Sequence, residues 1–154
     1  MLSLAQENPA QHEVEQLLQQ SDEHAASLYP PESNHLVDID ALSASNTRFF
    51  VARWDSRAVG CGAMVIDQDD DSAELKRMFV DPTVRGRGVA RALLELIEEQ
   101  ARSLGLRRLL LETGVKSGEA LTLYRRHGFS ERGPFGNYGP DPLSVFMEKK
   151  LWPH

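Results

Sequence analysis

Arginines and glycines alternate in a short run near the middle of the chain, RGRGVA at residues 85–90. The residues before it have the composition of a strand, and those after it repeat apolar side chains at helical spacing. A glycine-rich turn between a strand and a helix exposes backbone N–H groups at the positive end of the helix dipole. With two arginines, such a turn favours a phosphate or pyrophosphate. The residues of this expected anion site are Arg85, Gly86, Arg87, Gly88, Val89 and Ala90.

Two common phosphate-binding signatures do not fit this turn. The P-loop pattern GxxxxGK[ST] has no match in the chain. The dinucleotide pattern GxGxxG would start at Gly86 and need a third glycine at position 91, where Arg91 stands. The turn therefore belongs to another class of phosphate-binding motif.

The run RGRGVA resembles the R/Q-x-x-G-x-G/A signature of the GNAT superfamily of acetyl-CoA-dependent N-acetyltransferases. The runs ELKRMFV and LYRRHGF extend this resemblance over about residues 45–150. More narrowly, LYPPESNH, GCGAM, LETG and DPLSVFMEKKL are similar to small standalone bacterial acetyltransferases, most of them without an assigned substrate. The resemblance implies a GNAT-like mixed α/β fold, with a central, mostly antiparallel twisted sheet, one parallel splayed strand pair, and helices on both faces.

The resemblance also implies how acetyl-CoA would bind. In proteins with this signature, the strand before the turn splays from its neighbour, and its free backbone groups pair with the pantetheine arm as an added strand would. That role falls on the backbone of Met78, Phe79 and Val80. Many relatives carry a cofactor-contacting asparagine three residues before Ala120, where this chain has Ser117, so we expect that contact to be weaker.

Two candidate catalytic residues follow from the same resemblance. Tyr124 lies in LYRRHGF, similar to the (L/F)YxxxGF segment whose tyrosine protonates the departing CoA thiolate; a phenol with a pKa of about 10 keeps its proton at neutral pH. Glu74, early on the strand before the turn, is the candidate base for the acceptor ammonium. Period-two alternation places it on one face with Lys76, Met78 and Val80. The alternatives are a tyrosine that only packs and a glutamate paired to a basic side chain.

The acceptor side of the site is less well defined by the sequence. Glu112, at the end of the next strand, is the second candidate base. Tyr29, Glu32 and His35, in the segment LYPPESNH, are expected to face the acceptor. Their chemistry does not distinguish an amino acid, a polyamine, a drug or a protein terminus.

The sequence therefore predicts an enzyme that transfers an acetyl group from acetyl-CoA to a primary amine by direct attack in a ternary complex. A non-catalytic acyl-CoA-binding sensor is one alternative. An acyltransferase that uses another donor, such as succinyl-CoA, is a second. In look-alikes, pairing through the C-terminal strands is common, so a homodimer is also expected.

Composition limits the other classes of function. The 154 residues, a length typical of one domain, carry a formal net charge of −6, which argues against general nucleic-acid binding. No apolar run approaches the ~20 residues of a membrane span, and the N-terminus does not read as a signal peptide. The one cysteine, Cys61, excludes an internal disulfide, and we expect a cytoplasmic protein. No metal site is expected, because the aspartates at 67–71 lack the glycine and glutamate of a calcium loop.

The apolar periodicity and the turn residues predict the elements that position these side chains. We expect one domain over residues 1–154, with the element order ααβββαβαββ. A helix at 9–28 has Asn8 as its N-cap and Pro9 as its first residue, with a second short helix beginning at Ser21 or Asp22. The other expected helices are 38–42, 84–104 and 119–127, and the expected strands are 48–54, 58–66, 73–80, 106–112, 129–132 and 144–151.

Overall fold

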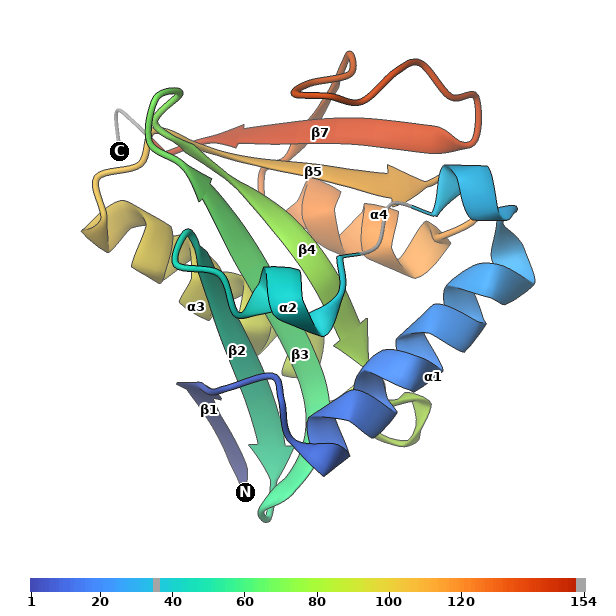
Figure 1. The fold of residues 1–154 in the computed structure, drawn as a ribbon, viewed down its shortest axis with the longest axis vertical. Coiled ribbons are helices and arrows are strands. Elements are labelled where there is room, and N and C mark those ends of the chain that lie inside the picture. The colour runs from blue at the N-terminus through green and yellow to red at the C-terminus, as the bar shows by residue number, and fades with distance from the viewer. Residues whose placement is uncertain (35–36, 152–154) are drawn as a thin grey trace.

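A computed structural model describes residues 1–34 and 37–151, in which a seven-stranded sheet carries helices on both faces (Figure 1). The strands are β1 (Leu2–Gln6), β2 (Thr47–Trp54), β3 (Arg57–Asp67), β4 (Ser72–Val80), β5 (Arg108–Gly114), β6 (Ser130–Arg132) and β7 (Ser144–Lys150). The helices are α1 (His12–Leu28), α2 (Ile39–Leu42), α3 (Val89–Ser103) and α4 (Gly118–Arg126), with 3-10 turns η1 (Pro31–Ser33) and η2 (Pro82–Val84).

The sheet has the strand order β1-β2-β3-β4-β5-β7-β6, and every neighbouring pair is antiparallel except β4 and β5. The predicted mixed α/β fold with one parallel strand pair is therefore confirmed. Helix α3 makes the crossover between the two parallel strands, because strands that run the same way need a long connection.

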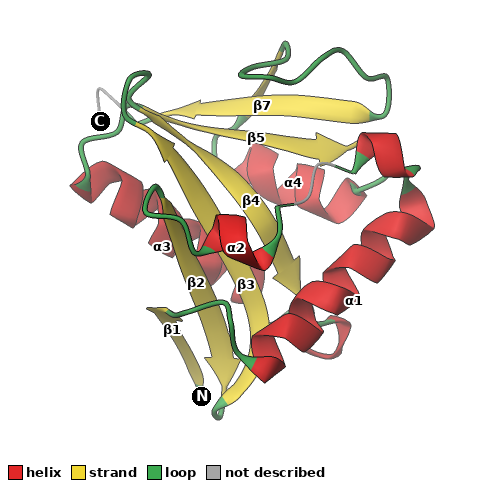
Figure 2. Ribbon diagram, in the orientation of Figure 1, coloured by secondary structure: helices red, strands yellow, loops and turns green. Residues whose placement is uncertain are grey.

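The parallel pair is short, and this opens the sheet. Strand β4 pairs with β5 only over Ser72–Leu75, opposite Arg108–Leu111. Beyond that, β4 stays with β3 as far as the Val80–Gly60 pair, while β5 stays with β7 as far as the Gly114–Ser144 pair. Figure 2 shows the two strands diverging from the end at which they pair.

Two apolar clusters hold the layers together, one on each face of the sheet. Helices α3 and α4 pack on one face through a cluster that includes Leu93, Ile97 and Leu121, and each such buried side chain contributes about 1.5–3 kcal/mol. Helices α1 and α2 cover the other face through Val14, Leu42 and their neighbours. Five apolar residues at helical spacing on α3 are buried, Val89, Leu93, Leu94, Ile97 and Ala101, whereas Leu104 at its end is exposed.

Several expected boundaries are wrong at the N-terminal end of the chain. Strand β1 was not expected. The short run LSLAQ has only two alternating leucines, and it becomes a strand by pairing with β2. Helix α1 begins at His12 rather than Pro9, and the side chain of Asn8 accepts a hydrogen bond from Ala10 N–H. No second helix begins at Ser21 or Asp22, since α1 continues unbroken to Leu28 and ends before Pro30.

The helix expected at 84–104 also begins later than predicted. The segment Pro82–Val84 forms a 3-10 turn, and Gly86 and Gly88 take positive φ angles of 78° and 80°. Helix α3 therefore starts at Val89, and the turn stays outside the helix. Helix α2 is confirmed within one residue, with the Asp38 side chain accepting from Ala41 N–H at 2.9 Å as its N-cap.

Candidate active site

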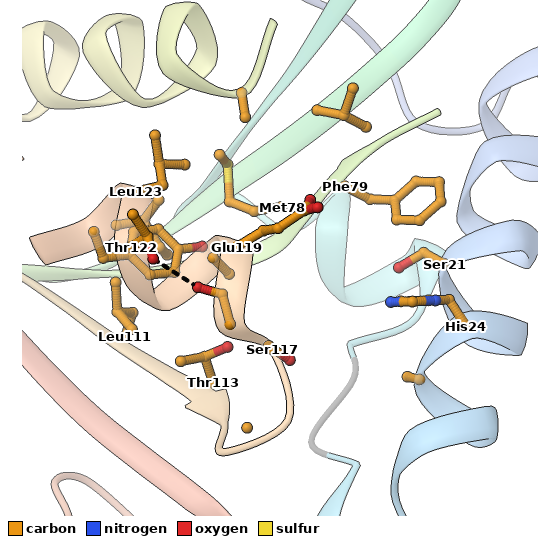
Figure 3. A pocket seen from close by; sticks show the side chains of 18 of the residues that line it. Ser21, His24, Met78, Phe79, Leu111, Thr113, Ser117, Glu119, Thr122 and Leu123 are labelled. Atoms are coloured by element: carbon orange, nitrogen blue, oxygen red, sulfur yellow. Dashed lines mark hydrogen bonds between the residues drawn. The ribbon is translucent and has the colours of Figure 1, made fainter. Parts of the chain in front are cut away.

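A cleft of about 1010 Å3 lies where β4 and β5 separate. Its walls are α1, the end of β4, the turn before α3, the end of β5 and helix α4. Figure 3 shows Ser21 and His24 of α1 on one side of this cleft, with Thr113 and Ser117 on the other. The cleft therefore brings together segments as far apart in the sequence as Ser21 and His127.

The turn at 85–90 presents the start of α3 without a protein cap. Gly88 is the N-cap residue and has no capping side chain, and the first turn of the helix holds no acidic residue. The first bond into the helix runs from Ala92 N–H to Gly88 C=O at 3.0 Å, so the amides of Val89, Ala90 and Arg91 lack helical acceptors. A Cβ built on Gly86 or Gly88 would meet no atom within 4 Å. The turn is thus open to a bound anion.

The two arginines of the turn point to different places. Arg85 lines the cleft, and its Nη1 lies 3.9 Å from Glu119 Oε2. The guanidinium of Arg87 lies over the Trp54 ring, 5.3 Å from its centroid, and does not line the cleft. Of the two cations expected to attract an anion, the structure therefore places Arg85 at the cleft.

Further basic residues at the cleft were missed by the sequence reasoning. Arg91 of α3 is exposed and lines the cleft together with Arg126 and His127 from the end of α4. The end of α4 comes near α3 there, with His127 Nε2 4.0 Å from Glu95 Oε1, and no local sequence pattern indicates this tertiary contact. Three residues of α1 also line the cleft, Ser21, Ala25 and Leu28. Their helical spacing in the sequence indicates that they share one face of the helix.

The end of β4 forms the floor of the cleft through Met78, Phe79 and Val80. Asp81 N–H donates to Val59 C=O of β3 at 2.8 Å. Because successive amides of a strand point in opposite directions, the N–H of Val80 faces away from β3, toward the side where β5 has separated. The strand thus turns this amide toward the open side of the cleft.

A β-bulge at Arg77 interrupts this strand. The register steps from Ala63 opposite Lys76 to Cys61 opposite Phe79, and Arg77 has a φ of +57°. The extra residue shifts the alternation, so the side chain of Met78 packs on the α3 face while Lys76 stays on the opposite face. The prediction that Glu74, Lys76, Met78 and Val80 share one face is therefore wrong.

Tyr124 of α4 lines the cleft and is 6% exposed. Its ring packs edge-on against Phe129, with centroids 5.7 Å apart. Within the described residues, its hydroxyl makes no hydrogen bond. Burial raises the pKa of this phenol to about 12, so it stays protonated far above neutral pH.

Glu74 lies outside the cleft and has partners of its own. Its carboxylate accepts a hydrogen bond from the Tyr138 hydroxyl and lies 3.1 Å from Lys76 Nζ. Burial, together with the Glu74 carboxylate, raises the pKa of Tyr138. The structure thus favours the alternative of a glutamate paired to a basic side chain. Two other carboxylates do line the cleft, Glu119 of α4 and Glu112 of β5. Glu112 accepts a hydrogen bond from Ser144 Oγ at 2.8 Å.

Only some of the residues expected near the acceptor line the cleft. Tyr29 packs against Gly114, and its hydroxyl accepts from Lys116 N–H and lies 2.9 Å from Ser117 Oγ. The expected cofactor contact Ser117 therefore shares its hydroxyl with Tyr29. Glu32 is exposed on η1 and does not line the cleft, and His35 lies outside the described residues.

Two features of other classes of protein are missing from the described residues. Within 1–34 and 37–151, no cluster of three or more histidine, cysteine, aspartate or glutamate side chains could hold a metal ion. In the same part of the chain, no helix has the length and apolar content needed to cross a membrane.

The fold and the turn before α3 define the class of protein. The model of the Acetyltransferase (GNAT) family matches residues 12–129, and the chain belongs to this family, as its motifs predicted. A protein of Azospirillum brasilense named IAA acetyltransferase is 53% identical over 150 residues, which cover 97% of this chain and 98% of the relative.

Solved structures agree with this assignment. A Klebsiella pneumoniae protein, solved as a candidate acyl-CoA N-acyltransferase, has a TM-score of 0.83 at 33% identity, covering 99% of each chain. The PaiA N-acetyltransferase of Thermoplasma acidophilum, solved in complex with coenzyme A, has a TM-score of 0.77 at 18% identity, over 98% of this chain and 99% of its own. At that identity the likeness is one of fold.

Proposed function

We propose that this protein transfers an acetyl group from acetyl-CoA to a primary amine by direct attack in a ternary complex. The observation that carries the proposal is the cleft between β4 and β5, which joins an uncapped helix start, the open side of strand β4 and a protonated tyrosine. No single one of these features is specific, but together they suit a long ligand with an anionic end and a reactive end.

The residues of the cleft fit such a ligand. The amides at the start of α3 and the guanidinium of Arg85 would hold a diphosphate, because the helix end lacks both a cap and an acidic residue. The backbone of Met78 and Val80 would pair with an extended arm along the open side of β4. When bound, acetyl-CoA supplies an activated acetyl group and a thiolate leaving group.

Two side chains at the other end of the cleft would donate and accept protons during the reaction. Tyr124 holds a proton that it can donate to a departing thiolate, since its hydroxyl has no partner within the described residues. Glu112 is placed to accept a proton from the acceptor ammonium, directly or through water. An unpaired amide of β4 would donate to the acyl oxygen as negative charge develops there. Alignment of the two reactants would contribute much of the rate.

The class of acceptor is the open part of the proposal. The name of the Azospirillum relative makes IAA one compound to test, alongside amino acids, polyamines, aminoglycosides and peptides with a free N-terminus. The homodimer remains a prediction that analytical ultracentrifugation would test.

The decisive experiment measures thiol release from acetyl-CoA with this acceptor panel, for the unmodified protein and for Tyr124→Phe. We expect turnover with at least one amine and a loss of about 100-fold in kcat for Tyr124→Phe, the size typical of a lost general acid. Calorimetry with CoA controls for binding and should give the same affinity for both proteins. Turnover that survives the substitution would contradict the acid role.

The same panel separates the alternatives. Tight CoA binding without turnover of any acceptor would favour the non-catalytic sensor. Faster turnover with succinyl-CoA than with acetyl-CoA would contradict the proposed donor.

A further inference from the structure

Arg77 occupies an unfavourable position for an arginine. The residue is 8% exposed, and its φ of +57° lies in the left-handed region, which costs a residue with a side chain about 1–2 kcal/mol. Its Nε is buried and has no hydrogen-bond partner among the described residues. A residue that is locally costly in two ways is expected to serve something other than local stability.

The side chain of Arg77 connects β4 to the middle of α1. Its Nη1 donates to Asp22 Oδ1 at 2.5 Å, and its Nη2 donates to Leu18 C=O at 3.2 Å. The arginine side chain is 3% exposed, while that of Asp22 is 53% exposed, so the guanidinium end of the pair is held inside the protein. Because the contact to Leu18 is made with the helix backbone, the arginine holds α1 itself in place.

The backbone of Arg77 is held from the opposite side. The thiol of Cys61 on β3 donates to Arg77 C=O at 3.3 Å. The β-bulge at Arg77 shifts the pairing of the residues that follow it with β3. Met78 and Val80 line the cleft in this shifted register. Arg77 thus belongs at once to the strand that forms the floor of the cleft and to the link with α1.

Helix α1 is a wall of the same cleft. Ser21, next to Asp22, and Ala25 and Leu28 one and two turns further on all line it. Across the cleft from them lie Thr113 and Ser117 (Figure 3). A shift of α1 relative to β4 would therefore change the width of the cleft at the end away from the turn before α3.

We propose that Arg77 is a positioning residue for acyl transfer, because it sets the distance between α1 and the bulged part of β4. The inference rests on the proposed function. Arg77 lines the cleft, but its guanidinium is engaged by Asp22 and Leu18, so it would act through α1 and not on a reactant. Its loss would misplace the acceptor, since a displacement of about 1 Å can cost 100-fold in rate. Binding of the CoA diphosphate, which depends on the start of α3, would be nearly unchanged.

The test compares Arg77→Met with a matched control, Arg102→Met. Arg102 on α3 also donates to a backbone carbonyl and a carboxylate, Leu151 O at 2.7 Å and Glu98 Oε1 at 3.0 Å, but it does not line the cleft. We expect Arg77→Met to lower kcat/KM for the acceptor by about 100-fold with less than about a threefold change in the Kd for CoA. Arg102→Met should lower kcat/KM by less than about threefold. Equal losses in the two variants would overturn the proposal.

Two milder variants keep the test valid if Arg77→Met does not fold. Arg77→Lys preserves the charge but cannot hold both Asp22 and Leu18, so it should recover part of the lost kcat/KM. Asp22→Ala removes one contact of the guanidinium and should give an intermediate loss. Full activity in both would also overturn the proposal.

A readout independent of activity separates this inference from the proposed function. Hydrogen exchange of the amides of α1 should become at least about tenfold faster in Arg77→Met than in Arg102→Met, because the helix loses its link to β4. If the unmodified protein acetylates no amine, the proposed function fails, and this measurement still decides whether Arg77 holds α1. Unchanged exchange would contradict the link.

Discussion

Glu74 and Glu112 stand near the point at which β4 and β5 separate, but their carboxylates have different surroundings. Glu74 is engaged by Tyr138 and Lys76 on the face of the sheet away from α3. Glu112 lines the cleft, and its carboxylate accepts a hydrogen bond from the Ser144 hydroxyl. At the scale of single residues, Glu112 is therefore the better candidate for deprotonating the acceptor.

This assignment predicts the outcome of a pair of substitutions. Glu112→Gln should lower kcat/KM for the acceptor by about 100-fold or more, because the amide cannot accept the proton. Glu74→Gln, which keeps a hydrogen-bond acceptor for Tyr138, should lower it by less than about tenfold. Steady-state kinetics with the best amine from the panel would measure both. If Glu74→Gln proved the more damaging change, the base role would return to Glu74.

At the scale of elements, the turn between β4 and α3 combines open space with positive φ angles. The space beside Gly86 is empty of protein atoms, so a methyl group there would meet only a bound ligand. Gly105, at the end of α3, has a similar φ of +74° and is equally open, but it lies outside the cleft. A side chain would thus cause similar backbone strain at both glycines, but only at Gly86 would it contact the proposed ligand.

Gly86→Ala and Gly105→Ala should therefore have the same effect on stability but different effects on CoA binding. Each should lower the free energy of unfolding by about 1–2 kcal/mol, the cost of a left-handed residue with a side chain. Gly86→Ala should also raise the Kd for CoA by about tenfold or more, because a methyl group would keep a diphosphate from the amides. Urea unfolding and calorimetry would measure the two quantities. An equal, unaltered affinity in both variants would show that the diphosphate binds elsewhere.

At the scale of the whole molecule, two buried acids link stability to alkaline pH. Burial raises the pKa of the Cys61 thiol from 9.0 to about 12, although the charge of Arg77 lowers it in part, and burial alone raises the pKa of Tyr124 from 10.0 to about 12. Both groups are protonated in the folded protein and ionise more readily once it unfolds. Their contribution to stability is therefore fully present below about pH 9 and is lost as the pH rises toward 12.

Cys61→Ala should flatten this pH dependence. We expect a loss of about 1–2 kcal/mol at pH 7, from the smaller side chain and the lost contact with Arg77, with a weaker decline in stability above pH 9 than in the unmodified protein. Urea unfolding at pH 7, 9 and 10.5 would measure this, with Tyr124→Phe as a comparison in which the decline should ease only above pH 10. A parallel decline in all three proteins would contradict the linkage.

The parts of the fold that follow local patterns could be predicted from the sequence. Helix α3, the hairpin of β3 and β4 and the parallel crossover depend on apolar periodicity and on turn residues within a few positions of one another. Strand β1 could not be predicted with the same means, because five residues at the edge of a sheet become a strand only through pairing with β2, some 50 residues further along the chain.

The candidate site divides in the same way. The motifs of the GNAT family, including the Arg/Gly turn at 85–90, are short runs of sequence, so the sequence by itself determined the family. The tertiary structure alone decided that Arg77 would bulge toward α1, that Tyr138 would reach Glu74 from 64 residues away, and that Glu112 would be left facing the cleft. The physical reason is that one extra residue in a strand exchanges its two faces, and only contacts between distant segments determine where that residue is inserted.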